Sequence, residues 1–174
     1  MRILVIIIMS IFVQAYSYCQ SGSLEDFLKA GPYVKLALEQ ASMGNHKNAI
    51  TNFGQALSIL PNDHIILYSR GNSYLKTYDI ENAIIDFSKC IEIDPSYEDA
   101  YFNRALAYTN LKNYKKAIKD YSKVIELNPT DSESYFKRGV LFGSLGDTTL
   151  ACADIEKAKL LGYVVPESMS NLCQ

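Results

Sequence analysis

The sequence predicts an all-α protein built as an array of four helix pairs. Three prolines, Pro61, Pro95 and Pro129, stand 34 residues apart, and the apolar residues between them repeat at the same interval. Self-similarity at such a period is typical of proteins in which each helix pair buries its apolar face against the next pair. Apolar residues within each copy follow the spacing of a helix face, and no alternating run indicates a β-strand.

Each copy divides into two expected helices that are joined by a short turn. In the first copy the apolar faces lie in residues 33–41 and 49–57, and Gly44-Asn45 marks the turn between them. None of the expected helices contains a proline, which would interrupt the backbone hydrogen bonds. The later helices are expected at 66–76, 80–93, 100–111, 114–127, 134–145 and 149–161, with turns at Tyr78-Asp79, Lys112-Asn113 and Gly146-Asp147.

Small and large residues alternate at fixed positions of the repeat. Small residues on both helices permit close approach of their backbones, and an aromatic ring on the second helix fills the volume beside them. The small positions are Gly71, Ala105 and Gly139 on first helices and Ala49, Ala83, Ala117 and Ala151 on second helices; the rings are Phe53, Phe87 and Tyr121.

Residues 1–20 have the layout of a secretory signal peptide. Arg2 is followed by an apolar run over 3–13 that is too short to span a bilayer, and small residues come at Ala15 and Ser17. We therefore expect export to the bacterial periplasm or to the extracellular space, with a lead-in segment at 21–29 before the repeats. A lipid anchor on Cys19 is the alternative, which Tyr18 argues against because lipoprotein signals have a small residue at that place.

Composition and motifs favour a protein without catalytic chemistry. The formal net charge is −2, and the sequence shows no basic block or stripe, so nucleic acid is not expected as a partner. His46 and His64 are isolated from any metal-ligand pattern, so no metal site is expected. Neither a phosphate-binding glycine loop nor a serine elbow occurs, and no nucleophile stands with a base. We expect no cofactor and no catalytic residue.

An arginine precedes an aspartate by sixteen residues in three of the four copies. The first copy lacks both members and has Leu36 and Asn52 instead. Joint presence and joint absence predict structural ion pairs across each helix pair, whereas an anion-binding row of arginines is the alternative. The pairs are Arg70 with Asp86, Arg104 with Asp120, and Arg138 with Asp154.

The spacing of glycine or alanine, tyrosine, alanine, aromatic residue and proline resembles the tetratricopeptide repeat. The resemblance covers a domain at 30–165, with repeats near 30–63, 64–97, 98–131 and 132–165. The chain departs from the family where Tyr33, Leu67, Tyr101 and Tyr135 replace a frequent tryptophan, and where Tyr163 replaces the fourth proline.

The resemblance implies a right-handed superhelix whose first helices line a groove for a peptide or a partner helix. Family members that bind a terminal carboxylate use basic and asparagine residues, which this chain mostly lacks, since Val34, Leu38 and Phe102 occupy such positions. Packing of the aromatic residues within the superhelix is the alternative to exposure in a groove. The expected groove residues are Tyr68, Asn72, Leu75, Phe102, Thr109 and Phe136.

The C-terminal segment 166–174 is expected to cap the last repeat, with a short helix at 167–172. Exported repeat proteins often carry paired cysteines around a Leu-Gly step at this place, and Cys152 and Cys173 flank Leu161-Gly162. A disulfide between them would close a loop of roughly 20 residues. Two free thiols, or an unrelated redox role, remain the alternatives.

The function predicted from the sequence is therefore binding. We expect an exported, non-enzymatic scaffold that holds a peptide or a partner protein in the groove of its first helices. The alternative is a structural protein of the cell envelope that associates with itself.

Overall fold

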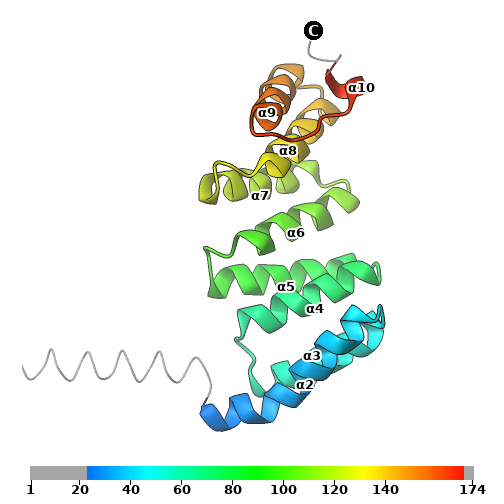
Figure 1. Ribbon diagram of the computed structural model, residues 1–174, viewed down its shortest axis with the longest axis vertical. Helices are drawn as coiled ribbons and strands as arrows, with labels where there is room; N and C mark the ends of the chain where they lie inside the picture. The colour runs from blue at the N-terminus through cyan, green and yellow to red at the C-terminus, as the bar shows by residue number, and fades with distance from the viewer. Residues whose placement is uncertain (1–22, 171–174) are drawn as a thin grey trace, which may run out of the picture. The chain divides into compact units, whose positions relative to one another are not determined.

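The computed structural model describes residues 23–170, in which eight long helices form four antiparallel pairs (Figure 1). The all-α repeat array expected from the sequence is confirmed. Residues 1–22, with the expected signal peptide and Cys19, and residues 171–174, with Cys173, lie outside the described residues. No helix within 23–170 is long and apolar enough to cross a membrane.

The chain divides into two compact units, Met1–Tyr78 and Asp79–Gln174. The first unit holds α2 (Leu24–Ser42), α3 (His46–Ile59) and α4 (His64–Lys76). The second unit holds α5 (Ile80–Ile93), α6 (Glu98–Asn110), α7 (Tyr114–Leu127), α8 (Ser132–Ser144), α9 (Thr148–Leu160) and the short α10 (Glu167–Ser170).

Helix α2 begins earlier than the sequence indicated and contains Pro32. Its start is fixed by a capping box: Ser23 Oγ accepts from the Asp26 backbone N–H at 3.1 Å, and the Asp26 carboxylate accepts from the Ser23 N–H at 3.0 Å. The Ser23 hydroxyl also donates to the Asp26 carboxylate at 2.7 Å, and this bond, together with the one from the Ser23 N–H, lowers the pKa of Asp26. The expectation of proline-free helices is thus wrong for α2, because the cap starts the helix upstream of the proline and most of the expected lead-in is helical.

The turn inside each helix pair has the left-handed backbone conformation that its sequence indicated. Gly44 has φ 79° and Gly146 has φ 85°, and the same repeat position is filled by Tyr78 with φ 63° and Lys112 with φ 55°. Residues other than glycine rarely adopt this conformation, since Cβ crowds the backbone there. The repeat thus imposes one turn geometry even where the residue is unfavourable for it.

Most helices start at an acidic or amide side chain that accepts hydrogen bonds from the first turn. Asp63 accepts from the N–H groups of Ile65 and Ile66, at 3.0 Å each, and Asp147 accepts from Leu150. Such caps satisfy backbone donors that have no partner within the helix. Asp79, Asn113 and Asp131 cap α5, α7 and α8 in the same way.

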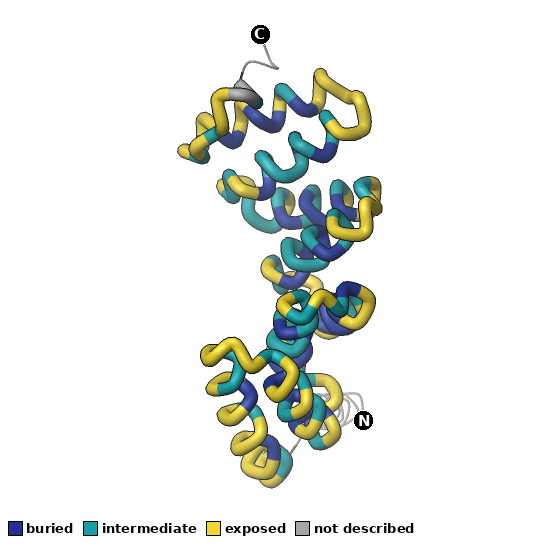
Figure 2. Tube along the Cα trace, turned by 90° about the vertical axis from the view of Figure 1, so that its right-hand side faces the viewer, coloured by how far each residue is buried: buried dark blue, intermediate teal, exposed yellow. Residues whose placement is uncertain are grey.

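The core of each unit follows the expected alternation of small residues and rings, and the buried positions run along the inner sides of the helices (Figure 2). Phe53 in the first unit, and Phe87 and Tyr121 in the second, are almost completely buried. At Gly139 an added Cβ would lie 3.0 Å from the Ala151 carbonyl oxygen, so α8 and α9 approach closely there. The predicted packing scheme is therefore confirmed.

Candidate functional site

Two of the three predicted ion pairs are confirmed in the second unit. Arg104 Nε and Nη2 donate to the two carboxylate oxygens of Asp120, each at 2.8 Å. Arg138 contacts Asp154 in the same bidentate geometry, at 2.7 and 2.8 Å. Burial by itself lowers the pKa of the Arg104 guanidinium. The interactions with Asp120 raise this pKa by more, so the pKa of Arg104 is raised overall. The Asp154 hydrogen bond likewise raises the pKa of Arg138 against the cost of burial.

Each of these arginines also binds a serine of the preceding helix pair, which the sequence had not indicated. Arg104 Nη1 donates to Ser88 Oγ at 3.0 Å, and Arg138 Nη1 donates to Ser122 Oγ at 2.9 Å. Both serines occupy one repeat position, where the first copy has Gly54. Each guanidinium thus ties its own pair to the previous one, so its role is structural rather than that of an anion-binding row.

The third predicted pair joins residues of different units. Arg70 lies on α4 and Asp86 lies on α5, and each of them makes interactions. A pair between these two residues stays a prediction.

In the second unit, half-buried side chains of α6 and α8, two of which also pack against the buried core, form what we call the first-helix surface. Leu141 of α8 shares a buried cluster with Ala105 of α6, which fixes the two helices against each other. Phe102 turns its edge toward Tyr121, with ring centroids 5.5 Å apart. The surface consists of Phe102, Leu106 and Thr109 on α6 and Phe136 and Val140 on α8.

Tyr163 occupies part of this surface. Its ring stacks on Phe136, with centroids 4.5 Å apart and planes inclined by 22°. Tyr163 follows α9 directly, where Gly162 has φ 90° and the Tyr163 N–H donates to the Ala158 carbonyl. The only sequence signal for this contact is the tyrosine in place of the fourth proline, because a proline ring could not form the same aromatic stack.

The other expected groove residues are half-buried as well. The Thr109 hydroxyl donates to the Ala105 carbonyl at 2.8 Å, so only its oxygen lone pairs remain for a partner. Tyr68, Asn72 and Leu75 lie on α4 in the first unit, and Tyr68 and Asn72 already take part in interactions. A groove that joins all six residues stays a prediction.

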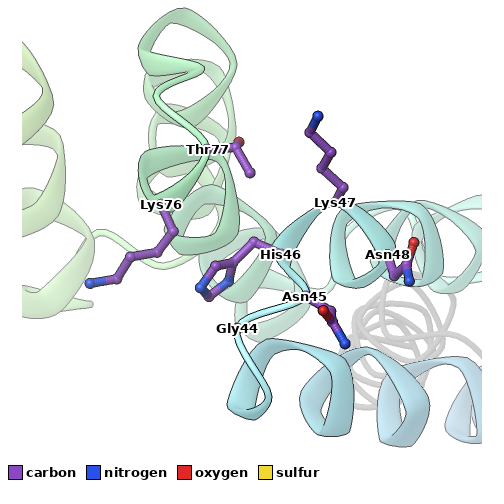
Figure 3. Close-up of a pocket in the computed structure, with 7 residues that line it drawn as sticks. All are labelled: Gly44, Asn45, His46, Lys47, Asn48, Lys76 and Thr77. Carbon is purple, nitrogen blue, oxygen red and sulfur yellow. The ribbon is translucent and has the colours of Figure 1, made fainter.

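A pocket of about 360 Å³ lies in the first unit, where the turn between α2 and α3 meets the end of α4 (Figure 3). His46 Nδ1 is buried there and has no hydrogen-bond partner within the described part of the chain. The side chains of Lys47 and Lys76 point in different directions (Figure 3). The pocket therefore lacks converging charges that could hold an anion.

The cysteines bear on stability rather than on catalysis. Cys90 is a buried thiol at a small-residue position of α5. Cys152 is half-buried on α9, and its predicted disulfide partner Cys173 lies outside the described residues, so this bond stays a prediction. Between residues 23 and 170, no group of three or more histidine, cysteine or acidic side chains could hold a metal ion.

Family models of the tetratricopeptide repeat match residues 30–63, 65–97, 98–131 and 121–153. These matches span most of the chain; the first three follow the repeat register derived above, whereas the match at 121–153 is shifted from the expected fourth repeat at 132–165. The chain is a tetratricopeptide repeat protein. It thereby belongs to a family of non-enzymatic scaffolds for protein–protein interaction.

Solved structures share the fold of this tetratricopeptide repeat protein. A crystal structure of MamA is 22% identical with a TM-score of 0.75, covering 76% of this chain and 77% of that one. MamA from Desulfovibrio magneticus is 23% identical with a TM-score of 0.72, covering 76% and 75%. The first repeat domain of Spaghetti (RPAP3), bound to an HSP90 peptide, is 23% identical with a TM-score of 0.66, covering 68% and 94%. No curated protein matches the sequence.

Proposed function

We propose that this tetratricopeptide repeat protein is exported and that it binds a peptide or a partner protein on its first-helix surface. The apolar run over 3–13 supports export. The stack of Tyr163 on Phe136 carries the binding proposal, because a segment outside the helix pairs lies on this surface through an aromatic side chain. A partner would dock aromatic or aliphatic side chains in the same way.

The composition of the surface supports an apolar anchor rather than a carboxylate. Phe102, Leu106, Phe136 and Val140 are partly exposed and uncharged. Aromatic and aliphatic anchors of this kind supply most of the affinity in many interfaces. The Thr109 oxygen is the polar group of this surface that could bind the backbone of a partner.

Photo-crosslinking tests this proposal in the native cell envelope. A benzophenone amino acid at Asn110, which is exposed at the end of α6, would capture a partner on the first-helix surface without disturbing the core. We expect defined adducts from this position. The adducts should be lost when Phe102→Ala and Phe136→Ala are added, provided that circular dichroism shows an intact helical fold.

A benzophenone at Glu156 is the matched control, because this residue is equally exposed but lies on the second helix α9. Equal adducts from Glu156 and Asn110 would contradict the proposal. Adducts from Asn110 that persist in the double variant would place the binding surface on other residues.

Self-association is the second candidate, and the outer face of the first helix pair favours it. Tyr33 and Leu36 of α2 are 39% and 43% exposed. The second and third repeats have Leu67 and Tyr101 at the position that corresponds to Tyr33, and these two side chains are only 2% and 9% exposed. The first pair thus leaves open an apolar position that later copies bury. A sedimentation coefficient that rises with concentration in the wild type but not in Leu36→Lys would support this candidate.

A further inference from the structure

Five lysines gather on one side of α7 and its preceding turn, in a protein whose formal net charge is −2. We expected no basic stripe from the sequence, yet these five lysines lie within twelve residues, and helical periodicity brings them to one side of α7. Lys112, Lys115 and Lys119 make no ion pair with any residue in 23–170, and Lys123 pairs with Glu126 at 2.7 Å. We call this set the basic stripe: Lys112, Lys115, Lys116, Lys119 and Lys123.

The packing of the repeat does not require lysine at these places. At the positions of Lys112, Lys115, Lys116 and Lys119, the second repeat has Tyr78, Glu81, Asn82 and Ile85, and the fourth has Gly146, Thr149, Leu150 and Ala153. Two repeats of the same fold thus accept uncharged or acidic residues at these four positions. The third repeat has lysine at all five stripe positions, whereas each other repeat has it at one: Lys47 at the position of Lys115, and Lys89 and Lys157 at the position of Lys123.

The backbone conformation of Lys112 is unfavourable for a lysine. Lys112 adopts φ 55° at a position where the first and fourth repeats have glycine. A side chain at this conformation costs stability relative to glycine. Stability thus gives no reason for lysine at this turn.

A pocket of about 460 Å³ opens beside the stripe, entirely within the second unit. Lys119 and Lys123 stand at its edge, and Ile91 of α5 and Tyr101 of α6 supply apolar walls. The Arg104–Asp120 pair lies at the pocket as well, with its charges mutually neutralised. The pocket therefore offers apolar contact beneath lysine ammonium groups.

We propose that the basic stripe docks an acidic peptide segment of a partner protein, with one apolar side chain of that segment in the adjoining pocket. Lys115, Lys119 and Lys123 are spaced about 6 Å apart along the axis of α7. Carboxylates at every fourth position of a partner helix have the same spacing, and alternate residues of an extended peptide come within about 1 Å of it. This surface lies on a second helix and is distinct from the first-helix surface.

The size and shape of the site favour a peptide over other anions. Proteins that bind DNA through its backbone contact about 6–10 phosphates, more than the stripe has lysines. A lipid headgroup plane would reach the lysines but would leave the pocket with Ile91 and Tyr101 unfilled.

Fluorescence anisotropy of the full chain tests the proposal with a labelled peptide that carries glutamate at every fourth position and one leucine. Lys115→Gln with Lys119→Gln removes two lysines that make no ion pair within 23–170, so the fold should persist. We expect this variant to bind the peptide about tenfold more weakly than the wild type, and wild-type binding to weaken as salt is added.

Lys157→Gln with Lys159→Gln on α9 is the matched control, since it changes the net charge equally outside the stripe. This control variant should bind like the wild type. Equal losses in both variants, equal binding of a peptide with glutamine in place of glutamate, or no binding at all would each overturn the proposal. So would stripe-dependent binding of oligo(dT), or of phosphatidylserine vesicles, in the absence of peptide binding.

Discussion

Tyr121 is a buried residue whose polar atom has no counterpart at the same position of other repeats. Phe53 and Phe87 fill this position in the first and second repeats, and all three rings are almost completely buried. The Tyr121 hydroxyl makes no hydrogen bond of good geometry in the described part of the chain, although Thr109 interacts with it and opposes part of the rise in its pKa. Burial raises the pKa of Tyr121, so the phenol stays neutral at physiological pH. A buried hydroxyl without a partner costs free energy of folding.

Tyr121→Phe should therefore increase the free energy of unfolding, by about 1 kcal/mol, because it removes an unsatisfied polar group and keeps the ring. Urea unfolding followed by circular dichroism measures the change. Phe87→Tyr is the reciprocal variant and should lower the free energy of unfolding. A loss of stability in Tyr121→Phe would show that the hydroxyl has a partner, such as a buried water molecule.

Contacts of single residues were predictable where the same spacing of residues recurs in several repeats. The contacts of Arg104 and Arg138 with aspartates were predictable because one spacing recurs in three copies. The contacts with Ser88 and Ser122 were missed, although these serines also recur, because serines are common and short. The stack of Tyr163 on Phe136 occurs once, so the sequence held no second copy to compare.

At the scale of elements, the helix pairs are held together by packing and by the arginine contacts. The Asp120 side chain is only 5% exposed, and Arg104 supplies both hydrogen bonds to its carboxylate. The same arginine binds Ser88 on α5, so one side chain joins three helices. Loss of Arg104 would leave a buried carboxylate without its counter-charge.

Arg104→Ala should therefore lower the free energy of unfolding by about 3–5 kcal/mol, and the double variant with Asp120→Ala should lose less. Denaturant unfolding of the two single variants and the double variant completes the cycle. Ser88→Ala is the control for the contact with the preceding pair and should have a smaller effect, since it leaves the bidentate pair in place. A double variant less stable than Arg104→Ala would refute the coupling.

Helix boundaries show where local sequence signals compete. The turns of the four pairs were predicted to the residue, because one left-handed position recurs at Gly44, Tyr78, Lys112 and Gly146. The start of α2 was placed too late because the apolar face was read only from Tyr33 onward, whereas the capping box at Ser23 starts the helix upstream of Pro32. A proline removes one hydrogen bond of a helix, and a well-formed cap with flanking packing can offset that loss.

For the whole molecule, the repeat period predicts the architecture but does not predict which surfaces bind a partner. The repeat positions that pack helices together recur and are recognisable, so the all-α array followed from the sequence. The positions that face outward differ from copy to copy, as the basic stripe of the third repeat shows. Such differences become a surface only when helical geometry aligns Lys115, Lys119 and Lys123, which is why the sequence alone did not reveal them.

The predicted disulfide between Cys152 and Cys173 acts on the whole chain, because it restricts the unfolded ensemble. A closed loop of roughly 20 residues should add about 3 kcal/mol to the free energy of unfolding. Alkylation of the chain without residues 1–20 under denaturing, non-reducing conditions should then give one adduct, at Cys90, and prior reduction should give three, since Cys19 lies in the removed segment. Mass spectrometry distinguishes these states, and three adducts without reduction would exclude the bond. Because the bond constrains mainly the unfolded chain, reduction should lower the melting temperature while the helical circular dichroism of the folded protein stays unchanged.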